Sequence, residues 1–351
     1  PSASWLSEDD STSNQITTGD PADLFGKPLE EVAARHANLI TGGQRMRVRE
    51  ARNPNQMLET TQEIAMAAQA VDIELDFAEA IRIGRSPTFD SMSTPLGPTG
   101  NVLRAEVVGN SSIPRKVDSI AGETDLLATD AMDELTRANI GEAHLSRLLS
   151  TGILGRQSAR RLVPTRWSIT ATDDTLGKRL WRKIRDNPSI DKVLVYEATY
   201  LDNRFHIVLT PGEWAFHMLE AWTTGSLWSV KGRILGDWED LKPRTKYANR
   251  VTGAYYAARL GVLEHLDLIG KSGACLIWRD IGEGYWAPVG VWLIRETVRQ
   301  AMKQTPRKFD SLEDALRYLN PRVSASDDLN KSWFVNRPKR KMLWQTKLDS
   351  F

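Results

Sequence analysis

The sequence predicts an α+β fold in which mixed sheets pack against helices, with a regular α/β fold as the alternative. Strand-like segments with alternating polarity and helix-like segments with three- to four-residue spacing interleave along the chain. They do so without the regular spacing of repeated β-α-β units. Of the 351 residues, 41% are hydrophobic and 26% charged, which is enough to bury a core and to solvate its surface.

The first half of the chain is expected to alternate short helices with a few strands. Residues 71–77 alternate apolar and acidic side chains with period two, as in a half-buried strand. Residues 85–100 contain three prolines and two glycines and predict a loop. Helices are expected at residues 28–39, 57–70, 123–139, 142–154 and 175–186, and further strands at residues 102–108 and 166–172.

The second half is expected to contain a β-hairpin over residues 192–209, turning around residues 201–203. Apolar runs at residues 274–281 and 288–294 predict two more strands. Beyond residue 320 the sequence is polar and basic, and nothing there resembles a core element. Helices are expected at residues 213–223, 246–268, 296–303 and 311–319.

Several classes of protein lack their signature here. There is no P-loop, no HExxH motif, no CxxC pair and no nucleophile elbow, and the five histidines are scattered. The one cysteine, Cys275, makes neither an intramolecular disulfide nor a cysteine-type zinc site. No apolar run approaches the ~20 residues of a membrane-spanning helix, and the first twenty residues do not resemble a signal peptide. We therefore expect a cytoplasmic protein without a membrane partner.

The densest cluster of functional side chains lies at residues 156–167. Four arginines and a tryptophan occur in this segment, although the 46 basic and 45 acidic residues of the whole chain nearly cancel. Guanidinium groups bind phosphate, and an indole ring stacks on a base. The segment is expected to bind nucleic acid or a nucleotide; the alternative is a solvated loop paired with the acidic helix 123–139. The residues are Arg156, Arg160, Arg161, Arg166 and Trp167.

Asp173 and Asp174 follow this segment directly. Adjacent carboxylates at the end of a strand suit a divalent metal of a hydrolytic enzyme. A carboxylate just before a helix is also the usual N-cap, which satisfies free N–H groups. The two residues are therefore candidate catalytic metal ligands, with capping of helix 175–186 as the more ordinary interpretation.

Three further residues are candidates for contact with nucleic acid. Arg204 lies at the tip of the expected hairpin, and Tyr285 and Trp286 lie in a glycine-rich turn. Aromatic side chains exposed on turns indicate contact with a ligand or partner. Burial at the base of the hairpin is the alternative for the two aromatic residues.

The chain ends in the pattern Q-x-x-L-x-x-F, formed by Gln345, Leu348 and Phe351. These side chains share one side of a short 3-10 turn. The basic run 337–341 precedes them and would steer an acidic partner. This is the form of the motif that binds the sliding clamp (PCNA), so the clamp is an expected partner.

The run RRLVPTRWSITATDDT at 160–175, with RLLSTGILG before it, resembles the signature of the archaeal Nre family of DNA repair proteins. Other segments resemble the family in the same order, among them PLGPTGNVLRAEVVGNSSIPRKVD (95–118), YLDNRFHIVLTPGEWAF (200–216) and YWAPVGVWLIRETVR (285–299). The resemblance implies a cytosolic protein that acts in DNA damage repair through the sliding clamp, with no assigned reaction. Two features depart from it: the N-terminal cysteine cluster of many members is missing, so no zinc site is implied, and the loop 84–95 differs.

Four regions follow from these observations. Residues 1–55 are expected to form a flexible lead and a short helix, 56–155 and 156–320 two Nre-like α+β regions, and 321–351 a basic flexible tail. The leading hypothesis is a DNA repair protein that binds nucleic acid or a nucleotide and docks on the sliding clamp. The alternatives are a metal-dependent enzyme acting on phosphodiesters or nucleotides and a non-enzymatic repair scaffold.

Overall fold

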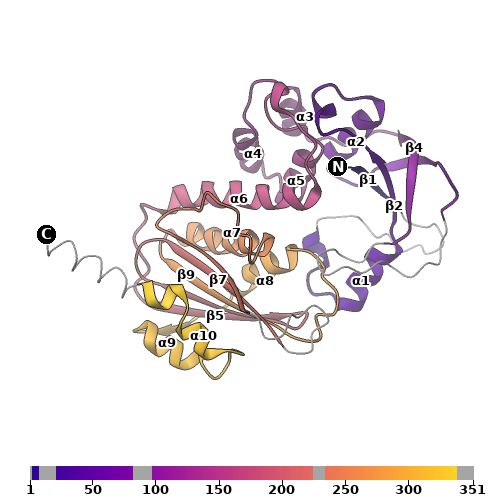
Figure 1. The fold of residues 1–351 in the computed structure, drawn as a ribbon. Helices are drawn as coiled ribbons and strands as arrows, with labels where there is room; N and C mark the ends of the chain where they lie inside the picture. Colours follow the sequence, from indigo (N-terminus) through magenta and orange to yellow (C-terminus); the bar gives the residue numbers. More distant parts are fainter. Residues whose placement is uncertain (1, 8–20, 82–96, 224–233, 338–351) are drawn as a thin grey trace. The chain divides into compact units, whose positions relative to one another are not determined.

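Two mixed β-sheets organise the chain in the computed structural model, which describes residues 2–7, 21–81, 97–223 and 234–337 (Figure 1). The α+β prediction is confirmed. The chain divides into two compact units, which we call unit 1 (Pro1–Leu176 with Ala287–Trp292) and unit 2 (Gly177–Trp286 with Leu293–Phe351). The division falls later in the chain than the boundary after residue 155 that the sequence predicts.

The sheet of unit 1 has four strands in the order β1-β2-β4-β3. Strands β2 and β4 are parallel, and the other neighbours are antiparallel. Because β1 pairs along its whole length with β2, the expectation of a flexible lead is wrong for these residues. The alternating strand at 71–77 is confirmed. The strands are β1 (Ser2–Ser7), β2 (Ile40–Arg45), β3 (Asp72–Phe77) and β4 (Thr99–Val108).

Helix α2 packs on this sheet, and further short helices complete unit 1. Helix α2 begins after Asn55, whose side-chain oxygen accepts a hydrogen bond from the N–H of Leu58 (2.9 Å) and caps the helix. Leu58 is fully buried in a cluster with Val102 and Leu162, so the segment around residue 162 is anchored in the core. The helices are α1 (Leu29–Asn38), α2 (Gln56–Met66), α3 (Arg115–Gly122), α4 (Ala128–Arg137) and α5 (Glu142–Ser150), with 3-10 turns η1 (Pro21–Leu24), η2 (Val48–Arg52) and η3 (Gln157–Ala159).

The sheet of unit 2 has six strands in the order β10-β5-β6-β9-β7-β8. Only the pair β7–β9 is parallel among them. The predicted hairpin is confirmed as β5–β6, and its turn places Leu201 and Asp202 at φ values of 47° and 54°. The strands are β5 (Val193–Tyr200), β6 (Asn203–Thr210), β7 (Ala215–Trp222), β8 (Ile234–Asp240), β9 (Ala274–Ile281) and β10 (Arg307–Phe309).

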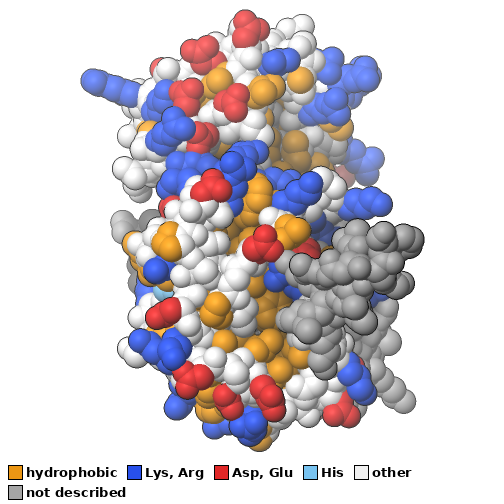
Figure 2. All heavy atoms as spheres, turned by 90° about the vertical axis from the view of Figure 1, so that its left-hand side faces the viewer, with side chains coloured by type: hydrophobic (Ala, Val, Ile, Leu, Met, Phe, Trp, Pro, Cys, Tyr) orange, Lys and Arg blue, Asp and Glu red, His pale blue; other side chains and the backbone are white. Residues whose placement is uncertain are grey.

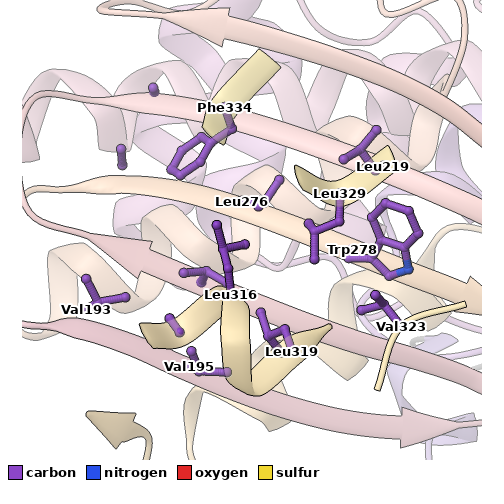
Figure 3. Close-up of a cluster of buried hydrophobic side chains, with 14 of the residues drawn as sticks. Val193, Val195, Leu219, Leu276, Trp278, Leu316, Leu319, Val323, Leu329 and Phe334 are labelled. Atoms are coloured by element: carbon purple, nitrogen blue, oxygen red, sulfur yellow. The ribbon is translucent and has the colours of Figure 1, made fainter. Parts of the chain in front are cut away.

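Helices cover both faces of this sheet. Helices α7 (Gly253–Leu268) and α8 (Trp292–Met302) lie on one face, and α9 (Leu312–Leu319) and α10 (Ser326–Asn330) lie on the other (Figure 1). Val323, Leu329 and Phe334 pack with the α9 side chains against β9 and β7 (Figure 3). The expectation that no core element follows residue 320 is therefore wrong as far as residue 337.

Two other expected elements have a different structure. Residues 215–222 form strand β7 instead of a helix, because β7 lies between β9 and β8 and has both faces covered. A strand buried on both faces shows no alternation, and its sequence cannot be told from that of a short buried helix. The strand expected at 288–294 is a loop followed by the first turn of α8, whose residues 292–294 are all buried.

Candidate nucleic-acid interface

The arginine-rich segment 156–167 runs from η3 into the start of helix α6 (Thr165–Ile184). The strand expected at residues 166–172 is therefore wrong. The hydroxyl of Ser168 donates to the carbonyl of Thr165 (2.9 Å), and that of Thr170 donates to Arg166 (3.1 Å), so both satisfy helical carbonyls. Buried positions recur every four residues at Ser168, Thr172 and Leu176. This four-residue spacing favours a helix, and it outweighs the β-branched residues of the segment, which favour a strand.

Arg160 anchors the segment to the rest of unit 1. Its guanidinium donates to three backbone carbonyls, those of Gly155 (3.0 Å), Ala121 (2.9 Å) and Glu123 (2.7 Å). Partial burial lowers its pKa from the ordinary value of an arginine. Arg160 thus fixes the path of the chain between α5 and α6 by binding the C-terminal end of α3.

Arg156, Arg161, Arg166 and Trp167 are exposed, and Trp167 keeps 46% of its surface accessible. The guanidinium carbon of Arg166 lies 5.8 Å from the centre of the Trp167 ring. Within the described residues, none of these three arginines forms an ion pair with a carboxylate. The alternative interpretation, a loop paired with the acidic helix, therefore does not describe them.

A second arginine-rich segment lies beside the first. The carbonyl of Val48 accepts a hydrogen bond from the N–H of Leu162 (2.9 Å), and the carbonyl of Arg52 accepts one from the Gln157 side chain (2.8 Å). Arg47 and Arg49 flank Val48 and are exposed. The sequence shows these arginines as a cluster, but nothing in it indicates that the two segments meet.

We call the exposed basic side chains of both segments, together with Trp167, the arginine surface. They come from parts of the chain about a hundred residues apart and belong to unit 1 alone. Arg166 lies in the first turn of α6, where the positive end of the helix dipole adds to its charge. The arginine surface consists of Arg47, Arg49, Arg156, Arg161, Arg166 and Trp167.

Asp173 and Asp174 lie inside α6 and not before a helix, so the expected capping role is wrong. Asp173 is fully buried, whereas Asp174 is half-buried. Consecutive helical residues point about 100° apart, so the two carboxylates do not face one point. Among the residues that the structure describes, no three His, Cys, Asp or Glu side chains are grouped closely enough to hold a metal ion.

The remaining candidates belong to unit 2 or to the chain end. Arg204 is exposed on β6, and Tyr285 is buried, with the Arg279 guanidinium 5.8 Å from its ring centre. Burial, the alternative interpretation, therefore holds for Tyr285, and Trp286 is half-buried beside it. Gln345, Leu348 and Phe351, like the loop 84–95, lie outside the described residues.

Comparison with known proteins places these features in a family. The model of the archaeal Nre N-terminal domain matches residues 5–229, and that of the Nre C-terminal domain matches residues 239–351. The chain belongs to the archaeal Nre family. Its arginine surface lies in the part matched by the N-terminal model. Strands β5, β6 and β7 of the six-stranded sheet lie in that part too, whereas β9 and β10 lie in the part matched by the C-terminal model.

Relatives in this family are named as DNA repair proteins. DNA repair protein NreA of Archaeoglobus fulgidus is 36% identical over 93% of this chain and 80% of its own length. NreA of Haloferax volcanii is 34% identical over 83% of this chain and 71% of its own. NreB of Archaeoglobus fulgidus is 33% identical over 91% of this chain and 80% of its own length. No solved structure matches the chain. Within the described residues, no helix is long and apolar enough to cross a membrane.

Proposed function

We propose that this chain is a cytoplasmic DNA repair protein that holds nucleic acid on its arginine surface. The observation that carries the proposal is the meeting of two arginine-rich segments at the hydrogen bond between Val48 and Leu162. It brings together five exposed guanidinium groups that have no carboxylate partner among the described residues. Such groups bind phosphates, and their counterions are released when they do.

The local character of this charge supports the proposal. Over the face drawn in Figure 2, basic and acidic side chains are interspersed, and the whole chain carries a formal charge of only +1. A cation in the first turn of a helix is repelled by the helix dipole. The position of Arg166 is therefore unfavourable unless an anion compensates it, and Trp167 beside it offers a ring on which a base stacks.

Fluorescence anisotropy with a labelled single-stranded oligonucleotide tests the proposal. Each substitution that removes a contact between an arginine and a phosphate should weaken binding. The double variant Arg161→Gln with Arg166→Gln should therefore raise Kd by roughly tenfold or more at low salt. The matched control is Arg137→Gln with Arg317→Gln, which removes the same charge from two exposed arginines that already pair with Asp133 and Asp314. If both double variants lost the same amount of affinity, the effect would come from net charge alone, and a binding site at the arginine surface would be refuted.

The second part of the proposal is docking on the sliding clamp through Gln345, Leu348 and Phe351. The support is the form of this motif and its position after a basic run. The first residue of that run, Arg337, pairs with Asp240 within unit 2 (2.7 Å), so steering of an acidic partner falls to residues 339–341. Phe351 should contribute most, since a buried aromatic is the usual hot spot.

Co-elution with a purified archaeal sliding clamp tests this part. Phe351→Ala should abolish it and leave the melting temperature unchanged, whereas Lys347→Ala, within the motif but outside its three anchor positions, should preserve it. Clamp binding that survives Phe351→Ala would show that the pattern is a chance match.

A further inference from the structure

We infer that unit 2 has a binding site for a phosphate monoester in a cavity beside the sheet strands β6 and β9. The cavity has a volume of about 200 Å³. Two arginines, a serine and an aspartate line it, namely Arg204, Arg322, Ser324 and Asp280. It is separate from the arginine surface, all of its lining residues belong to unit 2, and the inference does not depend on that surface.

The cavity lies where one face of the sheet changes from apolar to polar. Along β9, Leu276 and Trp278 point to the same side as Asp280, because alternate residues of a strand share a face. The two apolar residues pack against α9 and α10 (Figure 3). Asp280, farther along the strand, faces the segment 321–324, and the cavity is found there.

Asp280 is hydrogen-bonded to Ser324, lies near His206 and does not pair with Arg204. Its carboxylate accepts hydrogen bonds from the backbone N–H (3.3 Å) and the hydroxyl of Ser324, and its other oxygen lies 4.0 Å from Nε2 of His206. Arg204 stands directly opposite Asp280 in the β6–β9 register. Nevertheless, in the described part of the chain Arg204 forms no ion pair with Asp280 or with any other carboxylate. Its guanidinium is therefore available to a ligand in the cavity.

Arg322 is held in place before any ligand binds. Its guanidinium carbon lies 3.7 Å from the centre of the Tyr318 ring, and Nη1 donates to the Tyr318 carbonyl (2.6 Å). The Tyr318 hydroxyl donates to Glu197 (2.6 Å), whose other oxygen pairs with Nδ1 of the buried His206 (2.9 Å). This chain of contacts fixes the side chain, so little rotamer entropy is lost on binding.

Two guanidinium groups on one small cavity match a doubly charged anion. A phosphate monoester carries a charge of about −1.5 to −2 near pH 7 and offers three acceptor oxygens. The cavity is smaller than the ~300–1,000 Å³ of pockets that enclose drug-sized ligands. It therefore suits a phosphate together with a small part of the molecule that carries it. A free nucleotide and the 5′-phosphorylated end of a strand both present this group.

Calorimetry on the full chain with dAMP and with deoxyadenosine tests the site. dAMP should bind and deoxyadenosine should not, and Arg204→Gln should weaken dAMP binding by roughly tenfold. Arg204→Glu should weaken it further. Arg317→Gln, at an exposed arginine outside the cavity that pairs with Asp314, is the matched control and should leave dAMP binding unchanged. Loss of dAMP binding in Arg161→Gln would instead place dAMP on the arginine surface, which separates this site from the proposed function. Arg204 is exposed and forms no ion pair among the residues that the structure describes, so its variants should keep the melting temperature.

Two short oligonucleotides, one 5′-phosphorylated and one with a 5′-hydroxyl, distinguish a strand end from a free nucleotide as the source of the phosphate. A 5′-phosphorylated strand that binds more tightly than both its 5′-hydroxyl form and dAMP, in a manner sensitive to Arg204→Gln, assigns the site to strand ends. Tighter binding of dAMP assigns it to free nucleotides. Equal binding of dAMP and deoxyadenosine would overturn the inference, and so would dAMP binding that Arg161→Gln abolishes and both Arg204 variants leave unchanged.

Discussion

Two adjacent arginines should respond to substitution in opposite ways. Arg160 donates three hydrogen bonds to backbone carbonyls, whereas its exposed neighbour Arg161 has no carboxylate partner among the described residues. At roughly 0.5–1.5 kcal/mol net for each hydrogen bond, and with solvent screening because the group is only partly buried, Arg160→Ala should cost about 2–3 kcal/mol. Arg161→Ala should cost nearly nothing in stability but should weaken binding of single-stranded DNA.

Hydrogen exchange measured by mass spectrometry resolves this difference locally. In Arg160→Ala, peptides covering residues 119–124 and 155–163 should exchange faster, because the link between these segments is lost. The same peptides should be unchanged in Arg161→Ala, which serves as the matched control. Unchanged protection in Arg160→Ala, or faster exchange in Arg161→Ala, would refute the assignment of anchor and ligand-binding roles.

Three other substitutions test the packing and electrostatics of unit 2. Phe334→Ala should destabilise unit 2 by about 3–5 kcal/mol in urea denaturation, since Phe334 is 4% exposed in the core. Deletion of residues 338–351 should leave the stability unchanged. If Phe334→Ala did not lower the stability, the packing described would be contradicted. Glu239→Gln should cost about 3–5 kcal/mol, because it removes the charge that faces the buried Arg259 at 2.9 Å; a cost below 1 kcal/mol would oppose this. Burial lowers the pKa of His217 to about 3 from 6.5, so the unfolded chain binds the extra proton and stability should fall as pH drops from about 6.5 toward 3; His217→Leu should flatten this slope, and an unchanged slope would argue against a buried neutral imidazole.

The sequence predicted those elements whose pattern is local. Strand β3 alternates in period two, and the β5–β6 hairpin is two strand-like runs joined by a short turn, so both were found. Strand β7 was missed because it lies inside the sheet, where both faces are buried and no alternation remains. The segment after residue 320 was judged too polar for a core, yet its spaced apolar residues Val323, Leu329 and Phe334 join the α9 side chains in the core against the sheet.

The candidate site was predicted in part, for a similar reason. Arg156, Arg161 and Arg166 are close in sequence, so their clustering was visible, and the structure shows them exposed. The anchoring role of Arg160 depends on carbonyls some forty residues away. The approach of Arg47 and Arg49 depends on one long-range backbone hydrogen bond. Neither leaves a local signal.

The salt dependence of single-stranded DNA binding tests the central claim most directly. The slope of log Kobs against log salt concentration should be compared between the natural chain and a variant with glutamine at Arg47, Arg49, Arg156, Arg161 and Arg166. Each phosphate contact on a single strand contributes about 0.7 to that slope. If all five arginines contact phosphates, the variant's slope should be shallower by about 3.5. An unchanged slope would contradict the claim that these two segments form one nucleic-acid-binding surface.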